Sequence, residues 1–144
     1  MKIIYIALLF LGGAVVARAV WVRFAPDDPA RWHVTSSLTD PGHHGGANSH
    51  VYREPLAEGG QERFAAFDAV IRATPRTEVL AGSLEEGRIT YVTRSKLMGY
   101  PDYTTLSLTE TPQGALLEVF SRARYGKSDL GVTRARIEGW LAAL

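Results

Sequence analysis

The sequence contains no cysteine, so disulfide bonds, thiolate catalysis and cysteine-ligated metal sites are excluded. It also lacks an excess of basic residues. The formal net charge of the 144-residue chain is +1, and beyond residue 22 there are 14 basic side chains against 15 acidic ones. Nucleic-acid binding needs a clear basic excess, so we expect no nucleic-acid partner. Hydrophobic residues at 46% and charged residues at 22% are ordinary globular values, which excludes wholesale disorder.

Sequence motifs of known catalytic sites are also missing. GKSD, which begins at Gly126, is not a phosphate-binding P-loop, because Ser121 stands where that loop needs a glycine. The chain has neither a G-x-S-x-G nucleophile elbow nor an H-E-x-x-H metal motif. His43, His44 and His50 have a spacing that matches no standard metal site. We therefore expect no metal and no cofactor, and the sequence leaves enzymatic activity uncertain, leaning towards none.

The longest apolar run lies at the N-terminus. IIYIALLFLGGAVVA carries no charge, and residues 3–22 as a helix would rise about 30 Å, the thickness of a hydrocarbon core. As an anchor, this helix would place Arg18 and Trp21 at the membrane interface. As a cleavable signal, it would use Lys2 as its charged region and a small-x-small pattern that ends at Ala19. Both interpretations direct the chain to a membrane, and the length of the run favours the anchor.

Composition divides the chain into three parts. Residues 1–22 are the membrane anchor or signal segment, residues 23–60 a Pro/Gly-rich tether and loop, and residues 61–144 an α+β domain. One short strand is predicted within the tether at RWHVTSSL, where Trp32 and Val34 alternate with polar neighbours.

Residues 61–144 carry the pattern of a helix, several strands and a second helix. In QERFAAFDAVIRA the apolar residues fall on one helical face, and the helix must stop before Pro75. TEVLA, RITYVTRS, YTTLSLTE and ALLEVFSRA are rich in β-branched and aromatic residues and are predicted strands. In the third, leucines alternate with hydroxyl-bearing residues, which suits a sheet face in water. The last helix is expected to begin with Thr133 as its N-cap.

Consecutive strands with short connections favour an antiparallel meander. The expected fold is α+β: an antiparallel meander sheet of about four or five strands with two helices packed on one face, preceded by an N-terminal transmembrane helix. The GKSD stretch then becomes a strand-to-helix connection. Gly126 and Gly131 would take positive φ, and Ser128 and Asp129 would bond to local backbone.

The C-terminal stretch SRARYGKSDLGVTRARI resembles a family signature. Its spacing is similar to that of the bacterial domain-of-unknown-function family numbered 1499, which typically reads S-x-S-R-x-G-x-S-D-x-G-x-N before its last helix. ITYVTRS and the turn that begins at Gly99 also fit, so the resemblance covers roughly residues 61–144. Ala123 replaces a common serine, and Thr133 replaces a common asparagine. The resemblance implies a setting in the cell envelope and no established activity.

The arginines of the last strands suggest a binding function. Arg122 and Arg124 share one side of a strand, because residues two apart point the same way. With Arg88 or Arg94 on a neighbouring strand, they would form a cationic patch that grips a carboxylate or phosphate. Alternatively, acidic side chains such as Glu118 neutralise these arginines in structural pairs. The expected ligand-binding residues are Arg94, Asp102, Arg122, Arg124, Ser128 and Asp129.

The expected function is a non-catalytic binding or interaction module on the membrane. Its partners would be the membrane, through the N-terminal helix, and an anionic small molecule, a lipid headgroup or an envelope protein. The alternatives are a hydrolase-like envelope enzyme with a site near Asp102 and Asp129, and an accessory subunit of a membrane complex. Lys2 favours an inside N-terminus. The expected location is a bacterial inner membrane, with a single pass and the domain facing the periplasm.

Overall fold

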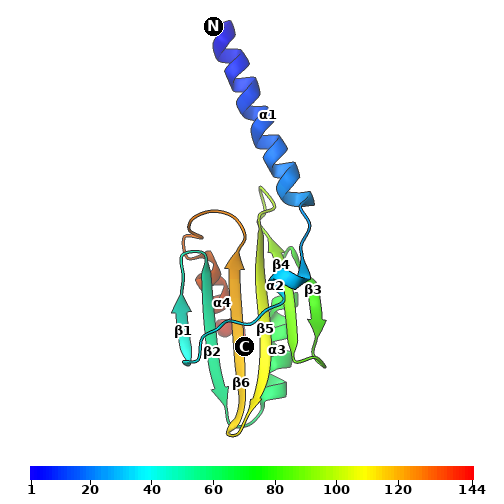
Figure 1. Cartoon of the computed structure of the whole chain (residues 1–144), viewed down its shortest axis with the longest axis vertical. Helices are drawn as coiled ribbons and strands as arrows, with labels where there is room; N and C mark the ends of the chain where they lie inside the picture. The colour runs from blue at the N-terminus through cyan, green and yellow to red at the C-terminus, as the bar shows by residue number, and fades with distance from the viewer.

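The computed structural model describes residues 1–144 and consists of one long protruding helix followed by an α+β domain (Figure 1). The α+β class agrees with the prediction. In chain order the elements are α1 (Lys2–Phe24), α2 (Pro29–Trp32), β1 (Gly42–Gly45), β2 (Ser49–Leu56), α3 (Gly60–Arg72), β3 (Thr77–Ser83), β4 (Arg88–Arg94), β5 (Pro101–Thr111), β6 (Gly114–Ala123) and α4 (Val132–Ala143).

The strands form one antiparallel sheet of six strands in the order β1-β2-β6-β5-β4-β3. β3 to β6 pair with their neighbours in sequence and form the predicted meander. β2 pairs with β6, and β1 forms the outer edge beside β2. The strand number expected from the sequence is therefore too low. The two missed strands lie in the Pro/Gly-rich segment, residues 23–60, which was expected to be a tether and loop.

Pro55 explains why the sequence does not predict β2, because a proline within a run of residues argues against a central strand. β1 is short, and its first residue, Gly42, lies opposite Arg53. At Pro55 the strand therefore has β6 on one side and no partner on the other. This is an edge position, where a sheet tolerates proline.

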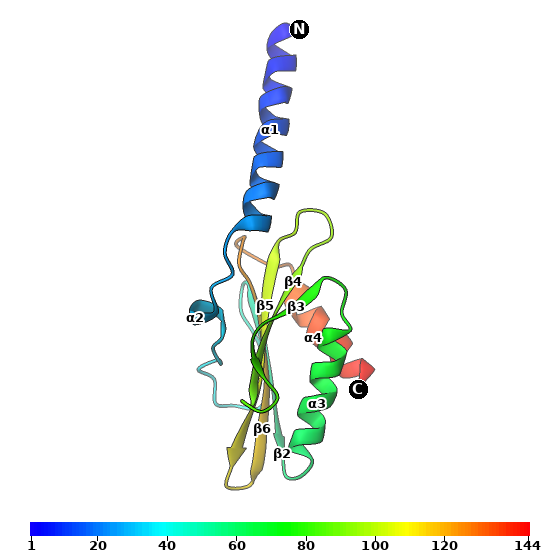
Figure 2. The same ribbon diagram turned by 90° about the vertical axis from the view of Figure 1, so that its right-hand side faces the viewer.

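The main hydrophobic core lies between the sheet and the helices α3 and α4, which cover the same face (Figure 2). This arrangement confirms the predicted two helices on one face. Asp68 of α3 is also buried there, and its carboxylate accepts a hydrogen bond from the Tyr91 hydroxyl at 2.5 Å and pairs with Arg72 at 2.7 Å. Burying each large apolar side chain contributes about 1.5–3 kcal/mol. The core side chains are Phe64, Phe67, Ile71, Ile89, Tyr91, Leu106, Leu117, Val119, Ile137 and Trp140.

The opposite face of the sheet is covered by residues 25–41, which we call the strap (Figure 2). Trp32 of the strap stacks on Tyr103 of β5 with ring centroids 3.9 Å apart. Glu118 of β6 accepts hydrogen bonds from the backbone N–H and the hydroxyl of Ser36, both at 2.7 Å. The same carboxylate pairs with Arg53 at 2.6 Å. The strap is therefore fixed to the sheet along its length.

The strap corrects two predictions. The hydroxyl-bearing face of β5 is not in water, since Thr105 is 1% exposed and Ser107 is 4% exposed. Thr105 instead donates a hydrogen bond to the Trp32 carbonyl at 3.1 Å. The strand predicted at RWHVTSSL is also wrong. Its first residues belong to the one-turn helix α2, because Asp28 caps the helix by accepting from the Ala30 N–H and Pro29 starts its first turn.

α1 carries the apolar run at the N-terminus. It has 23 residues, its most apolar stretch of 18 residues has a mean hydropathy of 2.3, and no residue of that stretch is buried against the domain. By length and composition it is a helix that can span a membrane or serve as a signal sequence. Its last turn is packed differently, because Val22 is fully buried where α1 meets the domain.

The strap makes a testable contribution to stability. Trp32→Ala removes the stack on Tyr103 and leaves a cavity beneath the strap, so the free energy of unfolding should fall by about 3 kcal/mol. Urea unfolding of the detergent-solubilised full chain measures this change. Gln113→Ala is the control, because Gln113 is exposed on the β5–β6 turn and its truncation should change the free energy by less than about 0.5 kcal/mol. Equal effects of the two variants would contradict the packing role of Trp32.

Candidate functional site

The candidate site lies at the end of the sheet from which α1 projects (Figure 1). Two loops meet α1 there: residues 95–100 between β4 and β5, and residues 124–131 between β6 and α4. Arg23 of α1 donates to the Leu97 carbonyl at 3.0 Å. Arg18 lies over the Tyr125 ring, with its guanidinium carbon 5.5 Å from the ring centroid. The end of α1 thus contacts both loops.

Asp27, the third residue after α1, links the strap to three strands. Its carboxylate pairs with Arg94 of β4 at 2.6 Å and accepts a hydrogen bond from the Tyr103 hydroxyl of β5. Arg124, which follows β6, lies 3.8 Å from the same carboxylate and donates to the Pro26 carbonyl at 2.9 Å. Burial, followed by the hydrogen bond to Asp27, raises the pKa of Tyr103 to about 12. We call this group the Asp27 clamp.

Arg122 is also turned towards the strap. It is 8% exposed, and its guanidinium donates to the carbonyls of Trp32 and Val34 at 2.9 and 3.2 Å. It lies over the Phe120 ring at 4.1 Å as well. Burial lowers the pKa of Arg122 to about 10. Arg122 of β6 and Arg124, directly after β6, therefore both hold the strap.

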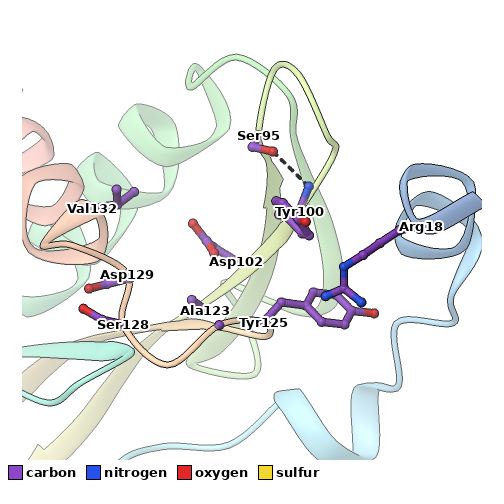
Figure 3. A pocket seen from close by; sticks show the side chains of 10 residues that line it. Arg18, Ser95, Tyr100, Asp102, Ala123, Tyr125, Ser128, Asp129 and Val132 are labelled. Atoms are coloured by element: carbon purple, nitrogen blue, oxygen red, sulfur yellow. Dashed lines mark hydrogen bonds between the residues drawn. The ribbon is translucent and has the colours of Figure 1, made fainter. Parts of the chain in front are cut away.

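Asp102, Ser128 and Asp129 line a cavity of about 380 Å³ between the two loops and the N-terminus of α4 (Figure 3). Tyr100 and Tyr125 form its aromatic wall, with ring centroids 5.8 Å apart. Asp102 pairs with Arg136 of α4 at 2.9 Å. Burial raises the pKa of Asp102, although the arginine opposes this effect. The structure therefore brings together three of the expected residues, with one carboxylate already neutralised by an arginine.

The carboxylate of Asp129 serves the start of α4. It accepts hydrogen bonds from the backbone N–H groups of Gly131 and Thr133, at 3.0 and 3.1 Å, and from the Thr133 hydroxyl. Ser128 accepts from the Leu130 N–H at 3.2 Å. The predicted local bonds of GKSD are thus confirmed, as is positive φ at Gly126 and Gly131.

The predicted cap of α4 is wrong in detail. Gly131 occupies the N-cap position, and Thr133 lies one residue inside the helix. Because glycine has no side chain to accept from the first turn, Asp129 takes over that function from two residues earlier. The threonine hydroxyl is the donor in this arrangement, and it supports the carboxylate rather than the backbone.

A second cavity, of about 390 Å³, lies on the other side of the 95–100 loop, and we call it the basic cavity. Ser95 lines both cavities. Arg94 is the residue of the basic cavity that the sequence analysis predicted. Reading the sequence missed its other cations, which come from α1, from the turn before β3 and from the 95–100 loop. The charged residues that line it are Arg23, Arg76, Glu78, Arg94 and Lys96.

The three cations that were missed share one property. Arg23, Arg76 and Lys96 have no carboxylate within ion-pair distance, whereas Arg94 is paired with Asp27. Arg76 donates to the Arg94 carbonyl at 3.0 Å and has a positive φ of 58°. The sequence signal that could have pointed to them is their position, since each lies at a boundary between an element and a loop.

The histidines of the β1–β2 hairpin lie outside both cavities. His43 Nδ1 and His50 Nε2 share a hydrogen bond of 2.9 Å, and His44 bonds to the Asp40 carbonyl at 2.9 Å. Burial, together with the charges of His43 and Arg134, lowers the pKa of His50. No group of three or more potential ligands is arranged to hold a metal ion.

The capping role of Asp129 predicts a pH dependence. Burial opposes ionisation of this carboxyl, but its hydrogen bonds from Thr133 and Gly131 outweigh that effect and lower its pKa. A lowered pKa stabilises the fold above the ordinary value of 3.8, and this contribution is lost as pH falls through the folded value. Asp129→Ala should therefore cost about 1 kcal/mol at neutral pH.

Urea unfolding of the Asp129→Ala variant beside the natural chain checks this dependence. The difference in unfolding free energy between the two should shrink below pH 3.8. Asp40→Ala, which removes an exposed carboxylate that has no ion pair, is the control and should show little difference at any pH. A gap between the natural chain and Asp129→Ala that grows on acidification would contradict the capping role.

Comparison with known proteins places the chain in a family. No curated protein matches it. Two solved structures are similar: protein CV1439 from Chromobacterium violaceum (18% identity, TM-score 0.43, 65% of this chain and 90% of that chain) and protein MLL2253 from Mesorhizobium loti (13%, 0.44, 66% and 97%). At these scores neither bears on function. The profile of the family described as "Protein of unknown function (DUF1499)" matches residues 22–144, which begins well before residue 61 and includes the strap. The chain belongs to this family, as its C-terminal signature predicted.

Proposed function

We propose that this chain is a membrane-anchored binding module that holds a phosphate-bearing anionic group in the basic cavity. The observation that carries the proposal is the set of three cations, Arg23, Arg76 and Lys96, that line one cavity and have no carboxylate partner. Seven other arginines of the chain lie in ion pairs: Arg53, Arg63, Arg72, Arg94, Arg124, Arg134 and Arg136. Three cations without an ion pair thus line one cavity in which a ligand has room to bind.

The two unpaired arginines of the basic cavity, Arg23 and Arg76, are held in place by hydrogen bonds to backbone carbonyls. Arg23 donates one N–H to the Leu97 carbonyl, and Arg76 donates one to the Arg94 carbonyl. Each guanidinium has five N–H donors in a rigid fork, so donors remain for an oxyanion. Holding the side chains before the ligand arrives reduces the conformational entropy that binding must remove.

The charges that line the basic cavity favour a phosphate group over an uncharged polar ligand. Arg94 is already neutralised by Asp27, so the unpaired charges facing the cavity are three cations against one carboxylate, that of Glu78. An excess of about two positive charges suits a phosphate monoester or diester. Lys96 adds a mobile ammonium group that can follow the ligand. A free phosphate and a phospholipid headgroup both carry an anionic phosphate group, so both match the positive charge of the basic cavity.

The length and composition of α1 support the proposed membrane location. Its length and hydropathy suit a single span, and Arg23 of the basic cavity lies in its last turn. We take α1 as an anchor in a bacterial inner membrane, with the domain on the periplasmic side, because Lys2 favours an inside N-terminus. A reporter fused after Leu144 that is active only in the cytoplasm would contradict this orientation.

Phosphate binding is tested on the full chain in nanodiscs of phosphatidylcholine, whose headgroup carries no net charge. Inorganic phosphate is titrated and its Kd is measured by chemical shifts of labelled arginine side chains. Arg76→Gln removes one charge-assisted interaction, worth about 1.5–3 kcal/mol, so the Kd should rise at least about tenfold.

Arg31→Gln is the matched control for the titration. Arg31 is exposed, lies on α2 and makes no ion pair, so the variant has the same net charge as Arg76→Gln. Its Kd should equal that of the natural chain. If both variants weaken binding equally, the attraction is a diffuse effect of net charge. If phosphate does not bind the natural chain, the proposal is wrong.

A further inference from the structure

We propose that the 95–100 and 124–131 loops rest on the bilayer and form a membrane-facing surface, with Leu97 entering the interface and Lys96 and Lys127 binding anionic headgroups. This inference rests on the anchor role of α1 in the proposed function. It goes further, because it fixes the position of the whole domain relative to the lipid and assigns the phosphate in the basic cavity to a headgroup.

The depth of the two loops follows from their contacts with α1. A helix of 23 residues is about 34 Å long, slightly more than a hydrocarbon core of about 30 Å. The membrane boundary therefore falls close to the last turns of α1. Arg18 lies about 9 Å before Phe24 along the helix axis, and it contacts Tyr125. Arg23 contacts Leu97 at the end of the helix. Loops that touch α1 at these residues lie at the depth of the interface.

The junction between α1 and the domain transmits this depth, because it is packed rather than flexible. Val22 is fully buried, and Ala25 is 6% exposed. Arg94 donates to the carbonyls of Val22 and Gly99, so one guanidinium joins the last turn of α1 to the 95–100 loop. Asp27, whose carboxylate forms the Asp27 clamp, lies two residues after Ala25. The loops therefore cannot leave the membrane boundary while α1 spans the bilayer.

The side chains on the loops have the chemistry of an interface. Leu97 is 83% exposed and Leu130 is 91% exposed, so moving either side chain from water into the acyl boundary would be favourable. Lys96 and Lys127 are exposed on the same two loops, and they are the only lysines of the chain beyond Lys2. Leucine buried at the acyl boundary and lysine among headgroups are a common combination in membrane-surface segments.

The far end of the sheet lacks this combination. The β5–β6 turn carries Pro112 and Gln113, which are exposed and uncharged. The contrast supports a lipid surface as the occupant of the loop end, since a protein partner would need no lysines paired with leucines at the depth of the last turns of α1. With the loops on the bilayer, Arg23 and Lys96 bring the basic cavity to the level of the headgroup phosphates.

The absence of cysteine allows a direct measurement of depth. Leu97→Cys is labelled with a nitroxide in the full chain, in nanodiscs of phosphatidylcholine with added phosphatidylglycerol. Collisions with oxygen, which partitions into lipid, are compared with collisions with a charged nickel chelate, which stays in water. The label should meet oxygen more often than nickel. Gln113→Cys, at the far end of the sheet, is the control and should show the reverse.

A second variant tests the charges. Lys96→Glu combined with Lys127→Glu, in the Leu97→Cys background, should move the label towards water when phosphatidylglycerol is present. The same substitutions should have a smaller effect in phosphatidylcholine alone, because the introduced glutamates then face no anionic headgroups that repel them. A label at Leu97→Cys that behaves as the one at Gln113→Cys, with α1 intact by mass, would overturn the proposal.

The outcomes separate this inference from the function on which it rests. Phosphate is titrated into the labelled chain in nanodiscs of phosphatidylcholine alone, where no anionic lipid competes for the basic cavity, and competition by added phosphatidylglycerol is measured separately. A label in water with phosphate still bound would overturn the membrane-facing surface and leave the binding module standing. A label in lipid with no phosphate binding would support the surface and remove the binding function. Binding of free phosphate that phosphatidylglycerol does not compete with would assign the basic cavity to a soluble anion and overturn the headgroup assignment.

Discussion

The carboxylate of Asp27 is the point on which the arrangement of helix, strap and sheet depends. It is shared by Arg94 of β4, Tyr103 of β5 and Arg124 after β6, so one side chain from the segment after α1 ties that segment to three neighbouring parts of the sheet. A carboxylate that is largely buried is stable only when it is paired and hydrogen-bonded, and here both conditions are met. The clamp determines where α1 leaves the domain.

The strap extends this effect across the face of the sheet. Its carbonyls accept hydrogen bonds from Arg122 and Thr105, and Ser36 binds the Arg53–Glu118 pair. Such polar groups would cost free energy if they were buried without partners. They are stable because the strap supplies partners along with the Trp32 ring. The polar face of the sheet is thus a binding surface for a part of the same chain, and two arginines without an ion pair, Arg23 and Arg76, line the basic cavity at the edge near α1.

Much of the fold could be predicted from local patterns. The helical spacing of Phe64 and Phe67 and the β-branched runs of the meander depend on neighbours in sequence, and both predictions are confirmed. The strap and β2 depend on distant partners. Asp27 and Arg94 are 67 residues apart, and Trp32 and Arg122 are 90 residues apart. No periodicity records such pairs, so a segment rich in proline and glycine was interpreted as a tether. For the same reason, the sequence could identify Arg94 and Arg124 as notable and not the carboxylate that they share.

The most direct test of the account concerns the rigidity of the Asp27 clamp. Two nitroxide labels, at Tyr5→Cys on α1 and at Gln113→Cys at the far end of the sheet, report the distance between helix and domain by pulsed electron resonance in nanodiscs. The account predicts one narrow distance distribution for the chain with Asp27, and a broad one after Asp27→Ala, because Arg94 and Arg124 then lose their common partner. A broad distribution in the chain that retains Asp27 would contradict it.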